Sequence, residues 1–193
     1  MKSDLLHKFH WIRHCPIHTL TRPSAKHFFS DPTHLVQTAL NSLTLTNPSL
    51  AYDPENKIIF RRPDTTKSKV AIVSGGGSGH EPAFAGYVGK GFLDASAAGT
   101  IFASPSAEQI RKAVMDCVDN EKGVLIIPMN YTGDVLNFGM ATEKARAAGI
   151  KTEFFAINDD VGVGKKKGGK VGRRGISGGI LVLKIVSALA EAG

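Results

Sequence analysis

The chain has 193 residues, of which 42% are hydrophobic, and this is enough for one domain with a buried core. Its apolar runs are shorter than the roughly 18–20 residues of a membrane-spanning helix, so we expect a soluble protein without a membrane partner. Two cysteines cannot build a disulfide framework and fit a reducing compartment such as the cytoplasm. Cys117 falls on an apolar helix face, which predicts a buried free thiol.

The formal charge of +7 is concentrated in two segments. Residues 1–26 carry +4 and residues 164–174 carry +6, which leaves −3 for the rest of the chain. Because the body is mildly acidic, the overall positive charge is weak evidence for nucleic-acid binding, and we expect no such partner. Salt-dependent binding of nucleic acid through residues 164–174 is the alternative.

Residues 1–25 form a basic segment, and we interpret them as a disordered extension. His10, His14 and His18 have helical spacing beside Cys15, but no carboxylate or second cysteine supports a metal cluster, so we predict no metal site. The segment lacks the long apolar core of a secretory signal. A mitochondrial presequence is the alternative to a cytoplasmic protein, because acids are few in this segment.

Hydrophobic periodicity predicts an alternation of strands and helices after residue 30. In chain order, the predicted elements are a helix capped by Asp31 with Pro32 at its first position and an apolar stripe over 35–43, a hairpin of strands 50–52 and 58–60, a strand 70–73, a short helix 81–88, a strand 92–98, a helix from Ser104 through 118, a strand 124–128, a helix 135–148, a strand 151–157 and a helix 178–192.

This alternation predicts an α/β fold with a mostly parallel sheet and helices on both faces. Polar or glycine-rich loops at 74–82, 130–134 and 158–164 each follow a predicted strand. Because the carboxyl ends of parallel strands meet at one edge of a sheet, these loops should lie together and form a ligand site.

The loop at 74–82 reads Ser-Gly-Gly-Gly-Ser-Gly-His-Glu-Pro and carries the strongest functional signal. Its glycines let the backbone approach a small ligand and present N–H donors to it. His80 adds a side chain that can transfer a proton near neutral pH. A tight turn alone would explain one or two of the glycines but not the whole pattern.

Two nucleotide-binding motifs are incomplete. The pattern G-x-G-x-x-G from Gly75 would need glycine where His80 stands. The pattern G-x-x-x-x-G-K at 164–170 is followed by Val171 instead of the Ser or Thr that binds magnesium. We therefore interpret 164–170 as a solvated basic loop and expect no nucleotide cofactor within this chain.

Asp134 ends the loop after strand 124–128 and precedes a helix. It can cap that helix, or it can accept a hydroxyl proton from a ligand, and the two roles are compatible. Asp159 and Asp160 form an acidic pair, which we assign to loop structure or an interface and not to a metal site.

Several segments together closely resemble the substrate-binding domain of dihydroxyacetone (glycerone) kinases, in the fused ATP-dependent form found in fungi. They are residues 74–82, 99–105, 130–138, 159–161 and 172–175. The resemblance runs from about Lys26 to Gly193. It implies that residues 26–193 are the first lobe of a DhaK-type dihydroxyacetone-binding domain.

The resemblance implies a kinase that transfers a phosphoryl group from ATP to dihydroxyacetone in glycerol catabolism. Gly77, Ser78, Gly79, His80 and Asp134 would contact the substrate, and His80 and Asp134 would handle its hydroxyl protons. The family pattern also implies a homodimer, and its animal relatives add a cyclising activity on FAD.

The resemblance also implies parts that lie outside this sequence. The family forms a covalent bond between the substrate carbonyl and a second histidine, which would lie beyond Gly193. A separate helical domain would hold ATP and Mg²⁺. We therefore expect this chain to supply part of the substrate pocket and to have no kinase activity alone. The alternative is a non-catalytic fragment that binds a small carbonyl compound or polyol.

The sequence departs from the family pattern at two places. Met129 stands where many members have a lysine, which would weaken polar contact with the substrate. Residues 176–179 read Ile-Ser-Gly-Gly where members usually read Ala-Gly-Thr-Val, which lowers the helix propensity at that point.

Overall fold

The computed structural model describes residues 32–63, 67–164, 166 and 168–193. The predictions made for residues 1–31, including the histidines beside Cys15 and the Asp31 cap, lie outside these residues. Within them, no helix is long and apolar enough to cross a membrane.

Six strands form a single sheet in the order β1-β2-β4-β3-β5-β6. They are β1 Leu50–Asp53, β2 Ile58–Arg61, β3 Ala71–Ser78, β4 Ala95–Ile101, β5 Val124–Ile126 and β6 Thr152–Phe154. The pairs β3–β4, β3–β5 and β5–β6 are parallel, and β1 and β2 form the predicted antiparallel hairpin at one edge. The prediction of an α/β fold with a mostly parallel sheet is confirmed.

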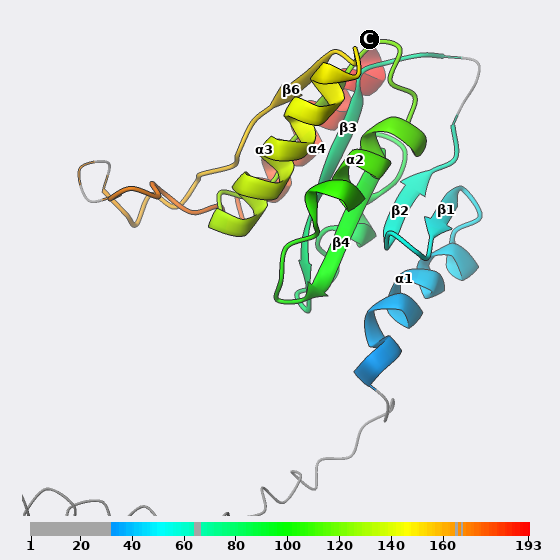
Figure 1. The fold of residues 1–193 in the computed structure, drawn as a ribbon, viewed down its shortest axis with the longest axis horizontal. Coiled ribbons are helices and arrows are strands. Elements are labelled where there is room, and N and C mark those ends of the chain that lie inside the picture. The colour runs from blue at the N-terminus through cyan, green and yellow to red at the C-terminus, as the bar shows by residue number, and fades with distance from the viewer. Residues whose placement is uncertain (1–31, 64–66, 165, 167) are drawn as a thin grey trace, which may run out of the picture. The chain divides into compact units, whose positions relative to one another are not determined.

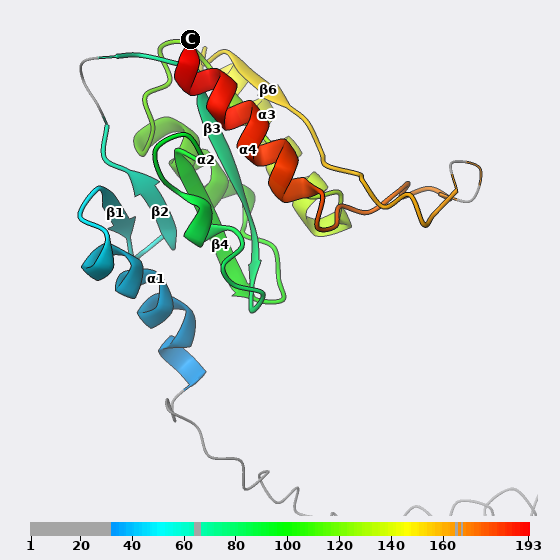
Figure 2. The same ribbon diagram turned by 180° about the vertical axis from the view of Figure 1, so that it is seen from behind.

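Helices cover both faces of the sheet (Figures 1 and 2). They are α1 Leu35–Thr46, α2 Ala107–Asp116, α3 Thr132–Ala147 and α4 Gly179–Ala192, with single 3-10 turns at Pro32–His34 and Ala85–Tyr87. Helices α2 and α3 pack on one face, and α1 and α4 lie on the other. The core is therefore split into two layers by the sheet.

Strand β3 explains why the apolar run before the glycines does not alternate. Ala71 and Val73 point toward the layer that contains Phe138 of α3, whereas Ile72 points toward the layer that contains Leu183 of α4. Successive side chains of a strand face opposite sides, so a strand covered on both faces needs apolar residues at every position.

The expectation that a strand ends at Val73 and a glycine loop follows is wrong. Strand β3 continues to Ser78, and its glycine half pairs in parallel with β4. The two backbones are so close that a Cβ on Gly75 would collide with the Ala97 carbonyl oxygen. Glycine has low strand propensity, and this hides a strand whose glycines are required by close packing.

The predicted helix at 81–88 is also wrong, since only the 3-10 turn Ala85–Tyr87 forms there. Its hydrogen bonds run from Tyr87 N–H to Phe84 O and from Val88 N–H to Ala85 O. Pro82 and the glycines on either side of this turn disfavour a longer helix.

Helix α2 begins later than predicted, because Ser106 and not Ser104 caps it. The Ser106 hydroxyl accepts a hydrogen bond from Gln109 N–H at 3.3 Å, and the Gln109 side chain accepts one from Ser106 N–H at 2.9 Å. This reciprocal capping box leaves Ser104 free of the helix, on the loop that follows β4.

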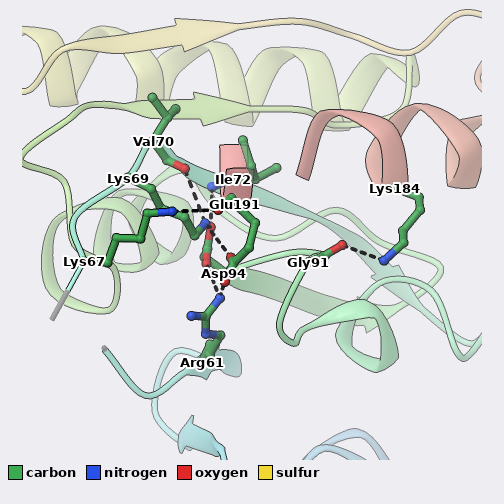
Figure 3. Close-up of polar contacts among 9 residues, drawn as sticks. All are labelled: Arg61, Lys67, Lys69, Val70, Ile72, Gly91, Asp94, Lys184 and Glu191. Atoms are coloured by element: carbon green, nitrogen blue, oxygen red, sulfur yellow. Dashed lines mark hydrogen bonds and ion pairs between the residues drawn. The ribbon is translucent and has the colours of Figure 1, made fainter. Parts of the chain in front are cut away.

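A cluster of paired charges joins α4 to the sheet (Figure 3). Asp94, only 8% exposed, accepts hydrogen bonds from Lys69 Nζ at 2.5 Å and Ile72 N–H at 2.9 Å. Arg61 lies 2.9 Å from Glu191 of α4 and 3.6 Å from Asp94. Because charges buried to this degree must be paired, the cluster fixes the last turn of α4 over the start of β3 and β4.

Replacement of Gly75 by alanine should lower the free energy of unfolding by at least about 2 kcal/mol, because the added Cβ forces β3 and β4 apart. Gly139→Ala in α3 is the matched control. A Cβ there meets nothing within 4 Å, and alanine favours helix by about 0.5–1 kcal/mol. Urea unfolding followed by circular dichroism measures both values. Equal stability of the two variants would contradict this account of the strand.

Cys117, at the end of α2, is buried as predicted and is 6% exposed. Burial, with smaller effects of the Asp53 and Asp116 charges, raises its pKa to about 12. Because only the thiolate reacts, a Cys15→Ser variant should react with a thiol reagent at pH 8 roughly a thousandfold more slowly when folded than when unfolded in urea. Rapid labelling of the folded variant would show that the thiol is accessible.

Candidate functional site

A cavity of about 630 Å³ lies at the carboxyl ends of β3 and β5, and its volume is within the range of small-molecule sites. The carboxyl ends of β3 and β5, the loop after β4, and the starts of α3 and α4 all contribute to it. It is lined by Gly76, Gly77, His80, Ala83, Phe84, Tyr87, Phe102, Ser104, Met129, Tyr131, Asp134, Gly175, Ile176, Ser177, Gly179, Ile180 and Leu183. This is the sheet edge at which the sequence predicts a ligand site.

Asp134 lies in the first turn of α3 and lines the cavity. The prediction that it caps the helix is wrong, because Tyr131 occupies the cap position and makes no side-chain cap bond. The aspartate is 7% exposed, and within the described part of the chain its Oδ1 has no hydrogen-bond partner. Burying a carboxylate oxygen without a hydrogen-bond donor costs free energy, so this oxygen indicates a ligand that supplies the donor.

The surroundings of Asp134 shift its proton affinity. Burial raises the pKa of the carboxyl above its usual value, and a hydrogen bond from Ser104 and the positive charge of His80 oppose this shift only in part. Its place in the first turn of α3 lets the helix dipole stabilise the ionised form. The group is thus a carboxylate whose proton affinity is higher than that of a surface aspartate.

His80 follows the end of β3 and lines the same cavity as Asp134. Its imidazole is exposed and contacts the Phe84 ring edge-on, with 5.9 Å between the ring centroids. The turn is ordered by a hydrogen bond from Gly79 N–H to Glu81 Oε1 at 3.0 Å. The structure therefore brings together the two side chains predicted to handle protons.

Only part of the glycine-rich segment 74–82 lines the cavity. Gly76 and Gly77 line it, and a Cβ on Gly77 would lie 2.9 Å from the backbone nitrogen of Ala103. Ser78 and Gly79 do not line it, and the Ser78 hydroxyl donates to the Gly99 carbonyl at 2.9 Å. Of the predicted substrate-contacting residues, Gly77, His80 and Asp134 share this cavity.

Sequence reasoning missed several lining residues. Ser104 lines the cavity and lowers the pKa of the Asp134 carboxyl, although its sequence position suggested only a helix start. The apolar wall of the cavity comes from Phe84, Tyr87 and Leu183, whose spacing along the chain resembles ordinary core positions. No sequence signal distinguishes such residues from the core, because they meet only in three dimensions.

The two departures from the family pattern meet in the structure. Met129 lines the cavity, and a Cβ on Gly179 would lie 2.9 Å from its Sδ and Cε. A Cβ on Gly175 would lie 2.8 Å from the same sulfur. Gly179 at the start of α4, which belongs to the departing segment, and Gly175, which does not, therefore both leave space that the methionine side chain occupies.

The near-match to a phosphate-binding loop, of which residues 165 and 167 lie outside the described part of the chain, does not stand directly between a strand and a helix in the chain order. Residues 164–170 lie between the end of β6 at Phe154 and the start of α4 at Gly179, and they adjoin neither element. A true phosphate loop connects its strand directly to its helix. Within the described residues, no group of three or more His, Cys, Asp or Glu side chains could hold a metal ion.

The fold and the cavity place the chain among α/β domains with a ligand-sized cavity at the carboxyl edge of the sheet. The chain belongs to the Dak1 domain family, whose model matches residues 41–193. The family predicted from the sequence is therefore confirmed.

Relatives of known name agree with this assignment. Dihydroxyacetone kinase 1 of Saccharomyces cerevisiae is 52% identical over 169 residues, which cover 87% of this chain and 28% of the yeast protein. The dihydroxyacetone-binding subunit DhaK of the PTS-dependent dihydroxyacetone kinase 1 of Listeria innocua is 43% identical over 159 residues, 82% of this chain and 48% of the subunit. The chain thus spans less than half of either relative.

A solved structure agrees in fold. The dihydroxyacetone kinase of C. freundii in complex with AMP-PNP and Mg²⁺ superimposes with a TM-score of 0.76 at 43% sequence identity. The match covers 88% of this chain and 32% of that one. Members of the family are dihydroxyacetone kinases, and ATP with Mg²⁺ is supported for the family by this complex.

Replacement of Asp134 by asparagine should stabilise the protein at pH 7–8. A carboxyl whose pKa is raised on folding contributes stability below its unfolded pKa, near 3.9, and loses that contribution as the pH rises through its folded value. Asparagine avoids the charged, unpartnered oxygen, so we expect a gain on the order of 1 kcal/mol at pH 7 that disappears below about pH 4.

Asp116→Asn is the control, because Asp116 is an exposed aspartate with a surface ion pair to Lys112 at 3.2 Å. Its stability should change by less than about 0.5 kcal/mol. Thermal unfolding from pH 3.5 to 8 measures both variants. Loss of stability in Asp134→Asn at pH 7 would mean that the carboxylate is well solvated or paired.

Proposed function

We propose that this chain forms part of the dihydroxyacetone pocket of a kinase that phosphorylates dihydroxyacetone with ATP. The observation that supports this most is the buried Oδ1 of Asp134, which has no hydrogen-bond partner among the described residues and lines the same cavity as His80 at the strand ends. A hydroxyl group of the substrate would supply the missing donor. The names of the relatives supply the identity of that substrate.

The residues of this chain would position and deprotonate the acceptor hydroxyl. When the hydroxyl oxygen forms its bond to phosphorus, its proton must leave, and Asp134 accepts it. A raised pKa makes this carboxylate a better base near neutral pH than an ordinary aspartate. His80, which lines the same cavity, would orient the substrate by hydrogen bonding and hold a second hydroxyl proton.

The backbone of Gly76 and Gly77 would form the floor of the pocket. The lack of side chains lets a small substrate approach the chain closely, which is the use that the sequence predicts for these glycines. Ser78 and Gly79 would contribute through backbone positioning, since the Ser78 hydroxyl is engaged by Gly99.

Other parts of the proposal concern the protein as a whole. ATP and Mg²⁺ would be held by another part of the protein, in keeping with the two incomplete nucleotide-binding motifs of this sequence. Residues 26–193 would be the first lobe of the binding domain, preceded by a basic extension at 1–25. A cytoplasmic homodimer acting in glycerol catabolism is the setting that we infer for it.

Calorimetry with dihydroxyacetone tests the pocket. We expect His80→Ala and Asp134→Asn each to weaken binding at least tenfold, because each loses a hydrogen bond to the ligand, and the exposed control Asp116→Asn to bind as the parent does. An assay for ADP release tests turnover, and the 193-residue chain alone should release none. Phosphorylation of dihydroxyacetone by this chain alone would refute the proposal that ATP is held by another part of the protein. Absence of dihydroxyacetone binding would refute the proposed pocket.

In a full-length kinase that carries this segment, Asp134→Asn should lower kcat by about 10²–10⁴-fold, the range for loss of a general base. The kcat of the parent enzyme should fall as the pH drops through the raised pKa of Asp134. An unchanged pH profile in Asp134→Asn would assign the proton transfer to another group.

A further inference from the structure

A second cavity, of about 410 Å³, lies behind the glycine end of β3, between this strand and α1. Its lining residues come from α1, from β3 and the turn that follows it, and from β4. They are Val36, Ala39, Leu40, Ser42, Leu43, Gly76, Gly77, Ser78, Glu81, Pro82, Ala83, Phe84, Ala85, Gly86, Ser96 and Ala98. The proposed function makes no use of this cavity.

One polar group in this cavity is unexplained. Ser96 of β4 is 1% exposed, and its Oγ has no hydrogen-bond partner among the described residues. The neighbouring Ser74 and Ser78 are also buried, but their hydroxyls donate to the carbonyls of Ile127 and Gly99. A buried hydroxyl without a partner is rare in native proteins, and here it lies at the wall of a cavity.

The charges of the lining residues restrict what could bind. Glu81 is the only ionisable residue among them, and its Oε1 already accepts the Gly79 N–H at 3.0 Å. The described lining residues include no cation that could pair with an anion, so phosphorylated compounds and carboxylates are disfavoured. The aliphatic side chains of α1 and the ring of Phe84 favour an apolar body.

We propose that this second cavity binds a neutral small molecule with an apolar body and one hydroxyl group, which completes the hydrogen bonding of Ser96. The inference does not depend on the substrate of the first cavity. It assigns a ligand class that differs from a triose, because most of the lining is apolar and a triose would leave its hydroxyls without partners.

The geometry also links the two cavities. Gly76, Gly77, Ala83 and Phe84 line both of them, so a single layer of residues separates the two sites. Phe84 is 8% exposed, and its ring contacts the His80 imidazole edge-on. A molecule that presses on one side of this ring should therefore alter the surroundings of His80 on the other side.

Benzyl alcohol, toluene and benzoate are suitable probes, because they share a ring and differ in the polar group. Binding is followed by two-dimensional NMR of the 193-residue chain. We expect benzyl alcohol to shift signals of Ala39, Ser96 and Ala98 with a dissociation constant on the order of 1 mM, and to bind more tightly than toluene. Benzoate should not bind, and the His80 ring signals should shift as benzyl alcohol saturates.

Two variants test the assignment. Ser96→Ala should weaken benzyl alcohol binding about fivefold and leave toluene binding unchanged, because only the hydroxyl contact is lost. Ala39→Trp should obstruct the cavity from the exposed side of α1 and abolish binding, whereas Leu45→Trp, on the same helix but outside the lining, should not. Circular dichroism establishes that each variant is folded.

Several results would overturn the proposal. They are the absence of saturable shifts at Ser96 and Ala98, shifts confined to Ile180 and Leu183 of the first cavity, equal binding of benzoate, and tighter binding of dihydroxyacetone at the same residues. Failure of dihydroxyacetone to bind the first cavity would refute only the proposed function, since the benzyl alcohol signals report on other residues.

Discussion

The close approach of β3 and β4 is the constraint on which the rest of the structure depends. Gly75 lies against the Ala97 carbonyl, and Gly99 lies equally close to the backbone at Ala103. Side chains at these positions would separate the two central strands and displace the loop that carries Ser104. The glycines are thus needed first for packing, and the bare backbone at the cavity floor is a consequence of that packing.

The same packing buries Asp134, which raises the pKa of its carboxyl and costs folding free energy when the group is ionised. The first turn of α3 is held against the glycine end of β3, so close that a Cβ on Gly76 would lie 3.9 Å from Asp134 Oδ2. Water is excluded from one carboxylate oxygen, and Ser104 engages the group only in part. Such an arrangement destabilises the folded state at neutral pH, and the general base that we propose for Asp134 would use this raised proton affinity.

The sequence was most informative where periodicity and burial agree. The hairpin, the mostly parallel sheet and the ends of α4 could be predicted, whereas the order of the strands was not, because apolar patterns indicate burial in the two core layers and not which strands are neighbours. The glycine half of β3 could not, since low strand propensity conceals pairing that only β4 enforces. Asp134 could be singled out from its place after a strand, but its missing partner depends on burial by distant segments. The unpartnered hydroxyl of Ser96 could not be predicted from the sequence, because a serine in a strand gives no sign of whether its hydroxyl finds a hydrogen-bond partner.

The two departures from the family pattern are better understood as one change. A lysine at position 129 would bring a charge and a long side chain to the cavity wall, whereas Met129 is neutral and packs its sulfur against the space left by Gly175 and Gly179. The glycine at the start of α4 has a low helix propensity, but α4 is held at its other end by the paired charges of Glu191 and Arg61. The helix can therefore tolerate glycine where it lines the cavity, and the apolar wall that results would leave the polar contacts that we propose for the substrate to His80 and Asp134.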